Sequence, residues 1–180
     1  AAMVLFGKNV GQFLLLCKIQ MGRFRGSNKY GQILHMRMFH GNAFEILRTA
    51  ADFLRKHHFI ASRFVDESFQ RIEEPTLPVF AVREALINAI CHRSYRGSSS
   101  SMYLAIYDDH MEIWNTGRLP PEWTLDKLKK WHQSEPRNEL VANVFYARDF
   151  IERWGMGVKK ILEECAEAGV PEPEYIQYSG

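Results

Sequence analysis

The chain has 180 residues, of which 46% are apolar and 24% charged, and its formal net charge is +2. This composition suffices for a buried core of ordinary size and excludes coiled-coil and disordered proteins. No apolar run approaches the roughly 18 residues that cross a bilayer, and no charged-then-apolar leader stands at the start, so we expect a cytoplasmic protein without a membrane partner.

The three cysteines, Cys17, Cys91 and Cys165, lie far apart in the sequence and form no Cys-x-x-Cys pair. This spacing indicates neither a zinc site nor a disulfide framework, and reduced thiols are the simplest interpretation. The chain opens with Ala1 and an apolar segment, without an initiator methionine. We interpret it as a fragment of a longer protein.

The first part of the chain is basic. Residues 1–70 carry ten Lys or Arg against four Asp or Glu, whereas residues 71–180 carry thirteen against seventeen. Aromatic residues lie among the basic ones in the segment that contains Lys18, Arg23, Phe24, Arg25, Lys29, Tyr30 and Arg37. Such a segment can follow a phosphate backbone, or it can be a solvated strand and loop.

Periodicity predicts the first elements. Residues 17–25 alternate as a strand does, and residues 42–57 have helical apolar spacing, with an asparagine at position 42 that can cap the helix. Residues 61–73 are rich in β-forming residues and predict one extended strand before Pro75 and Pro78. A second helix, which contains Glu84, follows these prolines.

A hairpin follows this second helix. Residues 102–107 and 111–114 alternate as strands, and Asp108-Asp109-His110 can join them in a turn. A helix, a hairpin and further helices in this order predict an α+β sandwich, in which a mixed or antiparallel sheet carries helices on one face. Residues 175–178 again have the pattern of a strand.

Residues 118–154 form a long spacer with two helical patterns, around 125–131 and 140–149. A connection of this length between two ligand-binding turns is typical of a lid. We interpret the apolar residues of the spacer as the core of that lid rather than as a cofactor box: Trp123, Trp131, Val141, Val144 and Phe145.

Gly155-Met156-Gly157 follows the spacer and precedes a helix over residues 158–168, which Gly169 and Pro171 end. Glycines at the start of a helix let backbone N–H groups approach an anion, and the helix dipole favours phosphate there. The alternative is an ordinary turn.

The helix with Glu84 and Asn88 is the most informative segment, because these residues are four positions apart and share a face. They lie roughly opposite an apolar stripe of Val82, Leu86, Ala89 and Ile90. A glutamate can orient or deprotonate a water, and an asparagine carbonyl can hold a hard cation such as Mg²⁺. The alternative is the solvated face of an amphipathic helix.

Three motifs occur in order: Glu-Ala-Leu-Ile-Asn-Ala-Ile-Cys-His-Arg, Met-Glu-Ile-Trp-Asn-Thr-Gly-Arg-Leu-Pro-Pro and Glu-Arg-Trp-Gly-Met-Gly-Val-Lys-Lys-Ile-Leu. This order resembles the GHKL superfamily of gyrase-type topoisomerases, heat-shock chaperones, histidine kinases and MutL repair proteins, and more narrowly its RecG-related helicase or transcriptional-regulator branch. The resemblance covers residues 75–175. It implies a two-layer sandwich of the GHKL, or Bergerat, type that binds ATP with Mg²⁺.

The resemblance implies roles for four residues of the Glu84 helix. Glu84 matches the carboxylate that orients the attacking water, the general base of phosphoryl transfer to water. Asn88 matches the amide that ligates Mg²⁺ at the triphosphate. His92 and Arg93 match the His-Arg pair that this branch carries near the mouth of the pocket.

The later motifs match nucleotide-binding turns. Gly155 and Gly157 match the glycines that face the phosphates, and Gly117 matches the glycine of the adenine turn. Asn115 stands where gyrase and MutL relatives carry an Asp that accepts from the adenine amino group. Because an amide both donates and accepts, base identity is open. Leu119 replaces a second glycine of that turn, which narrows the expected pocket.

Together these expectations describe a Mg²⁺-dependent ATP-binding regulatory module, with slow or no hydrolysis, of a DNA-binding protein. Residues 1–40 would be the tail of a preceding Alba-like, Schlafen-related DNA-binding domain plus a leading strand. Residues 41–180 would be the ATP-binding domain, with 118–154 as lid and its last strands truncated. DNA would bind through the full-length protein, and the module could form a homo-oligomer.

The alternative is a non-catalytic dimerisation or DNA-interaction module with a degenerate nucleotide pocket. Asn115 and Leu119 favour this alternative, and the Glu84/Asn88 pair disfavours it. No Gly-x-x-x-x-Gly-Lys-Ser/Thr phosphate loop occurs in the sequence, so a helicase motor is not predicted.

Overall fold

The computed structural model describes residues 1–9, 17–57, 60–65, 70–95, 101–130, 132–151 and 155–178. A four-stranded sheet lies at the centre of the molecule, in the order β2-β1-β5-β6. Its strands are β1 (Lys18–Phe24), β2 (Ile33–His40), β5 (Met102–Ile106) and β6 (Met111–Trp114). β1 and β5 are parallel, whereas β1 pairs with β2, and β5 with β6, in antiparallel fashion.

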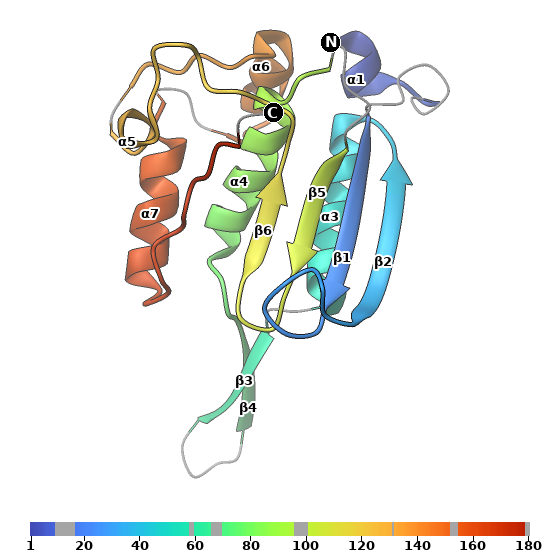
Figure 1. The fold of residues 1–180 in the computed structure, drawn as a ribbon, viewed down its shortest axis with the longest axis vertical. Helices are drawn as coiled ribbons and strands as arrows, with labels where there is room; N and C mark the ends of the chain where they lie inside the picture. The colour runs from blue at the N-terminus through green and yellow to red at the C-terminus, as the bar shows by residue number, and fades with distance from the viewer. Residues whose placement is uncertain are drawn as a thin grey trace.

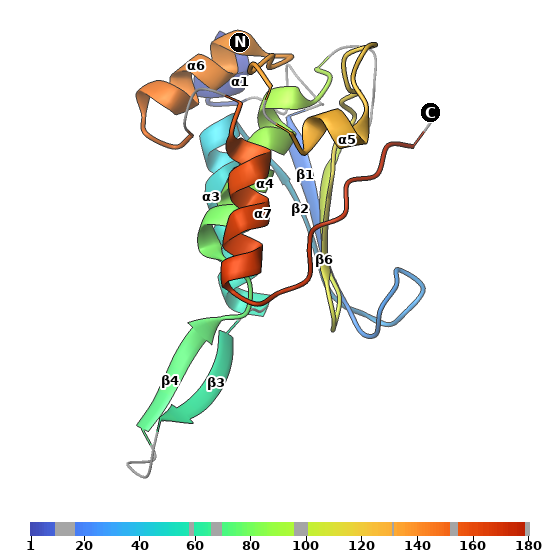
Figure 2. The ribbon, with the colours of Figure 1, turned by 90° about the vertical axis from the view of Figure 1, so that its left-hand side faces the viewer.

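Two long helices, α3 (Ala43–His57) and α4 (Val79–His92), cover one face of this sheet (Figures 1 and 2). Side chains alternate between the two faces of a strand, so each strand sends every second residue toward the helices. The resulting core joins sheet and helix residues that include Ile19, Met21, Leu104, Ile106, Ile46, Ala50, Phe53, Leu86, Ile87 and Ile90. Within the described part of the chain, no helix covers the opposite face (Figure 2).

The helix α7 (Gly157–Glu167) packs along α4 on the helical side of the molecule (Figure 2). A second small core, formed by Ala81, Ile161 and Cys165, joins these two helices. α4 is therefore covered on two sides, by the sheet and by α7.

Three shorter helices and a hairpin complete the fold. The helices α1 (Ala2–Phe6), α5 (Leu125–Leu128) and α6 (Glu139–Ala147) lie toward one end of the sheet (Figure 1). At the opposite end, β3 (Ile60–Val65) and β4 (Gln70–Pro75) pair with each other and project away from the sheet. Among the described helices, none has both the length and the apolar character that crossing a bilayer requires.

Local sequence explains how two of the helices begin or end. At the start of α3, the Asn42 side chain accepts from Glu45 N at 3.0 Å while the Glu45 carboxylate accepts from Asn42 N at 2.8 Å, a reciprocal capping box. At the end of α7, Val170 N donates to Cys165 O and Gly169 N to Ala166 O, with a φ of +67° at Gly169. This is a Schellman motif, which a glycine allows at little steric cost.

The predicted fold class is confirmed, since a mixed sheet with helices on one face forms an α+β sandwich. The single strand predicted over residues 61–73 is wrong, because the chain there forms the β3–β4 hairpin, with residues 66–69 outside the described part. β2 was missed because both of its faces mix apolar and polar residues. Residues 175–178, expected to form a strand, run extended without strand pairing.

Residues on both sides of the domain boundary expected at residue 40 belong to one hydrophobic core. Val4 and Leu5 of α1 and Ile19 and Met21 of β1 belong to the same core as Phe145 of α6. The expected lid also takes part, because α6 packs against α4. Trp131, which we expected in the lid core, lies outside the described residues.

Candidate functional site

The helix α4 begins immediately after Pro78, whose fixed φ suits a helix entry. Leu86 and Ile90 face the sheet, whereas Ala81 faces α7. Glu84 is on the α7 side and is 5% exposed. The alternative that Glu84 lies on a fully solvated face of α4 is therefore wrong, because the Glu84 side chain is buried.

Glu84 and Asn88 interact with each other within this helix. The Asn88 amide nitrogen donates to Glu84 Oε1 at 3.3 Å, as expected for side chains one turn apart. Asn88 itself is half-buried. The pair places a carboxylate and an amide oxygen together, and both are suitable ligands for a hard cation.

Gly157, the first residue of α7, lies directly against Glu84. A Cβ atom at Gly157 would come within 2.1 Å of Glu84 Oε1, so only glycine fits unless the carboxylate moves. The N-terminal end of a helix carries partial positive charge, which favours a carboxylate at this place. The glycine motif and the Glu84 helix, far apart in the sequence, therefore meet.

Asn115 joins the end of β6 to α4. Its Nδ2 donates to Ala89 O at 3.3 Å, and its Oδ1 accepts from Gly117 N. An aspartate could not donate to the Ala89 carbonyl, which gives a structural reason for asparagine here. A Cβ at Gly117 would lie 2.3 Å from His92 O, so this turn also lies against α4.

Gly155 lies against the expected lid. Its φ is +65°, a conformation that favours glycine. A Cβ at this position would come within 1.9 Å of His132 O and 3.1 Å of Ser134 N. The Gly-x-Gly motif is thus wedged between the backbone at residues 132–134 and the Glu84 carboxylate.

His92 lies at the end of α4, close to positive charge. Burial lowers the pKa of His92, and the nearby Arg137 and His132 lower it further. Arg137 is exposed, and its guanidinium donates to Arg118 O at 3.0 Å. Sequence reasoning missed Arg137 and His132, although both lie in the Pro-Arg-Asn and Trp-His segments of the expected lid.

Arg93 points away from this group. It is 1% exposed, its Nη1 donates to Lys18 O at 3.3 Å, and its guanidinium lies over the Tyr95 ring at 5.0 Å. Burial lowers the pKa of Arg93. Arg93 therefore connects the end of α4 to β1 inside the protein. We expected it near the mouth of a pocket, but the structure buries it.

Asn138 is a second residue that sequence reasoning missed. Its Nδ2 donates to Cys91 O at 2.9 Å and to Arg93 O at 2.8 Å, and its backbone N donates to Cys91 O at 3.1 Å. These bonds satisfy carbonyl groups that the end of a helix leaves without partners. Asn138 thereby fastens the start of α6 to the end of α4.

The C-terminal segment passes close to Glu84. Burial raises the pKa of Tyr175 to about 12, with further contributions from the nearby Cys165 and Glu84. In Figure 1 this segment runs between α7 and β6. Burial together with Glu84 also raises the pKa of Cys91 to about 12, so its thiol stays protonated at neutral pH.

Most of the expected site residues therefore gather around α4. Asn88 and Gly157 both contact Glu84, and Asn115 contacts the Ala89 carbonyl of the same helix. Gly117, His92 and Gly155 lie around this group. In the part of the chain that the structure describes, no three His, Cys, Asp or Glu side chains gather as a metal site. A cation here would need oxygens from its ligand, as Mg²⁺ takes from phosphates.

Comparison with known proteins adds a family match. The family model described as "Putative ATP-dependent DNA helicase recG C-terminal" matches residues 100–180. The matched part includes Asn115, Gly155 and Gly157, whereas Glu84 and Asn88 lie before it. The match supports an ATPase-like domain of RecG-related proteins.

A solved structure has a similar fold. The crystal structure of the DIP2311 protein from Corynebacterium diphtheriae matches with a TM-score of 0.72 and 22% sequence identity. The match covers 89% of this chain and 32% of that one, so the chain spans about a third of the length of DIP2311. At this identity the similarity shows the fold. No curated protein matches the chain.

Proposed function

We propose that this chain is a Mg²⁺-dependent ATP-binding module, with slow hydrolysis, that regulates a larger RecG-related DNA-binding protein. The observation that carries the proposal is the convergence of three separate motifs on α4. Asn88 donates to Glu84, Glu84 lies against Gly157, and Asn115 donates to Ala89 O. If α4 only presented a solvated polar face, these distant motifs would have no reason to contact it.

Each residue has a chemical role in this proposal. Asn88 would supply its amide oxygen to Mg²⁺, whose remaining positions suit phosphate and water oxygens. Mg²⁺ would neutralise charge on the triphosphate. Glu84 would orient the attacking water and accept its proton. Because Glu84 is 5% exposed, water reaches it poorly, and we expect turnover to be slow.

A positive group supports an anionic ligand. Arg137 is close enough to lower the pKa of His92, so it brings a cationic group to one end of α4. Arginine suits phosphate because its planar guanidinium donates in a fork. Asn115 keeps one amide hydrogen and one oxygen lone pair beyond its bonds to Ala89 and Gly117, enough for a base edge.

Titration calorimetry of the complete chain with ATP, in the presence and absence of Mg²⁺, tests the binding step. We expect ATP to release or absorb heat on binding when Mg²⁺ is present. Asn88→Ala should lower the affinity about tenfold or more, at least as much as the loss of a residue that orients a metal ligand. Asn143→Ala, which removes an exposed amide from α6, should bind as the unchanged chain does. No heat and no thermal shift at millimolar nucleotide would remove the proposal.

Hydrolysis needs a separate test. Glu84→Gln keeps the size of the side chain but removes its basicity, so binding should persist while phosphate release stops. Glu167→Gln, at the exposed end of α7, is the matched control. Unaltered turnover in Glu84→Gln would assign the base to another residue.

The competing function is a non-catalytic module for dimerisation or DNA interaction. It gains if DNA binding falls steeply with salt while nucleotide has no effect on it. In the proposal itself, DNA binds through the full-length protein in the cytoplasm, and assembly into a homo-oligomer would be measured by sedimentation with and without ATP.

A further inference from the structure

The face of the sheet away from α3 and α4 carries aromatic side chains. Tyr103 on β5 and Trp114 on β6 are directly opposite each other in the register, with ring centroids 5.9 Å apart. Their neighbours in the strands, such as Leu104 and Ile113, point toward the helices. Tyr103 and Trp114 therefore face the side that no described helix covers.

A second aromatic row extends this face toward β1. Phe24 stacks on Tyr107 with centroids 5.4 Å apart, and Tyr107 stacks on His110 at 4.4 Å. A Cβ at Gly22 would lie 2.5 Å from the Phe24 ring, so the glycine lets this ring lie over the strand. The rings thus form a broad platform rather than isolated contacts.

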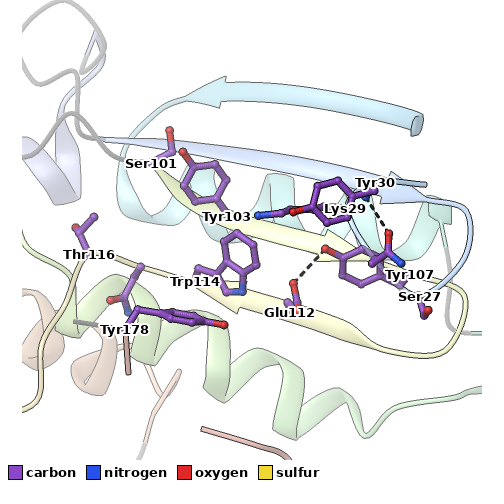
Figure 3. A pocket seen from close by; sticks show the side chains of 12 residues that line it. Ser27, Lys29, Tyr30, Ser101, Tyr103, Tyr107, Glu112, Trp114, Thr116 and Tyr178 are labelled. Carbon is purple, nitrogen blue, oxygen red and sulfur yellow. Dashed lines mark hydrogen bonds between the residues drawn. The ribbon is translucent and has the colours of Figure 1, made fainter. Parts of the chain in front are cut away.

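This platform is hollowed. A cavity of about 550 Å³ opens over it, and Figure 3 shows Tyr103 and Trp114 in the middle, with Tyr178 beside Trp114 and Tyr30 beside Tyr107. Trp114 is 40% exposed and Tyr30 is 87% exposed. Planar rings that remain accessible in a shallow hollow suit a planar ligand that stacks on them.

The segment from β1 to β2, next to the hollow, is basic. Residues 17–40 contain five Lys or Arg and no Asp or Glu, and of the five Arg23 is paired with Asp108. Lys29 lines the hollow, and Arg25 is exposed nearby in the chain. The Glu112 carboxylate, which also lines it, accepts from the Tyr107 hydroxyl at 3.1 Å.

We propose that this open face binds single-stranded nucleic acid, with bases stacked on Tyr103 and Trp114 and phosphates facing the basic β1–β2 segment. Aromatic platforms with an adjoining basic groove bind single strands without strong sequence preference, because every base has a π-face. Charge favours this occupant over a second copy of the chain, since two basic segments would repel each other. Asn115 also lines this hollow, so the surface adjoins the group of residues around Glu84 at that position.

Fluorescence anisotropy of the complete chain with labelled oligo(dT) and oligo(U) of about 20 nucleotides tests the proposal, since binding sites of this type take about 4–16 nucleotides. We expect saturable binding that weakens about tenfold in Tyr103→Ala and in Trp114→Ala, the scale of one lost stacking contact. Trp114→Phe keeps a ring and should restore most of the affinity. Tyr146→Ala, an equally exposed aromatic of α6 at 40%, should change nothing.

Salt dependence tests the basic segment separately. A combined Arg25→Ala and Lys29→Ala variant should flatten the fall of affinity with salt, whereas Arg48→Ala, on exposed α3 surface, should not. Photo-crosslinking then locates the strand. Crosslinks at Tyr103 and Trp114 support the proposal even if an alanine variant fails to fold, and crosslinks confined to α4 or α7 overturn it.

Two further outcomes also overturn the proposal. One is no saturable binding at protein concentrations on the order of 100 μM, where even non-specific nucleic-acid binding is measurable. The other is a dimer in sedimentation experiments that Met36→Lys disrupts and that single-stranded nucleic acid leaves unchanged. Met36 is the position to change because it is exposed on the edge strand β2. Variants away from the shared residue Asn115 distinguish this proposal from ATP binding: Tyr103→Ala should retain ATP binding, and Asn88→Ala should retain oligonucleotide binding.

Discussion

Gly155 and Gly169 have nearly the same backbone conformation, with φ of +65° and +67°, but different surroundings. At Gly155 a Cβ would meet His132 O, whereas at Gly169 nothing lies within 4 Å. The two positions therefore separate the cost of a left-handed backbone from the cost of a collision with the neighbouring chain.

Alanine at each of these glycines gives our first prediction. Gly169→Ala should destabilise by about 1–2 kcal/mol, the cost of a left-handed alanine. Gly155→Ala should lose at least about 1 kcal/mol more, since a backbone carbonyl must also move. Urea denaturation of both variants measures the difference. Equal losses would mean that the contact of Gly155 with His132 does not constrain the protein.

A second prediction at this scale concerns pH. Burial lowers the pKa of His92 and of His57, with Arg137 and His132 acting on the first and His35, Lys56 and Arg23 on the second. Below the ordinary pKa of 6.5 the unfolded chain takes up these protons first, so stability falls as pH decreases through and below that value. Above it, neither residue contributes.

Urea denaturation at pH 7.5 and 5.5 measures this loss. Each unit by which the folded protein lowers a histidine pKa reduces the free energy of unfolding by about 1.4 kcal/mol once the pH is below the folded pKa. The more exposed His57 should contribute less. His92→Gln should reduce the pH dependence, and His40→Gln, at an exposed position of β2, is the control. Unchanged pH dependence in His92→Gln would show that His92 titrates normally.

At the scale of the elements α4 is central, because α3, α6, α7 and β6 all contact it. The side-chain amide of Asn138 donates hydrogen bonds to two carbonyls at the end of this helix, Cys91 O and Arg93 O. The start of α6 therefore keeps its place through polar contacts as well as through Phe145 in the core.

Asn138→Ala tests this fastening. Removing the amide takes the Asn138 donor away from Arg93 O, while Cys91 O keeps the backbone N–H of residue 138, and we expect a loss of about 1–3 kcal/mol. Asn138→Asp should cost more, because it places a carboxylate against the same carbonyl oxygens. Thermal unfolding followed by circular dichroism measures both, with Asn143→Ala as the matched asparagine variant. A Tm like that of the control would assign the hold on α6 to apolar packing alone.

The sequence was sufficient for elements whose signal is local. Asn42 predicts where α3 begins, and Gly169 predicts where α7 ends, because caps act within a few residues. The burial of Glu84 was not predictable in this way, since its cover, α7, comes much later in the chain. The same holds for Arg93, whose partner Lys18 lies on the distant strand β1.

On the scale of the whole molecule, the centre of the sheet joins distant parts of the chain. β1 lies between β2, its neighbour in sequence, and β5, which follows only after α3 and α4. Alternation showed which residues of β5 share a face but not which strand lies beside them, so neither this parallel pairing nor the aromatic face of Tyr103 and Trp114 was predicted.

The family match begins at residue 100, yet residues 100–180 lack both β1 and α3. We predict that this piece alone does not fold, because Leu104 and Ile106 would lose the core that covers them. The complete chain should unfold cooperatively, while the shorter one should give a poorly dispersed proton NMR spectrum. A dispersed spectrum for residues 100–180 would show that β5 does not depend on β1.

The position of β1 also affects how newly made chains mature. A ribosome releases the β1–β2 ribbon well before β5, so the apolar side of the ribbon waits uncovered while α3 and α4 are synthesised. Contacts between segments so far apart form slowly, and exposed apolar surface invites aggregation meanwhile. Newly made chains should therefore be most prone to aggregation before β5 pairs with β1.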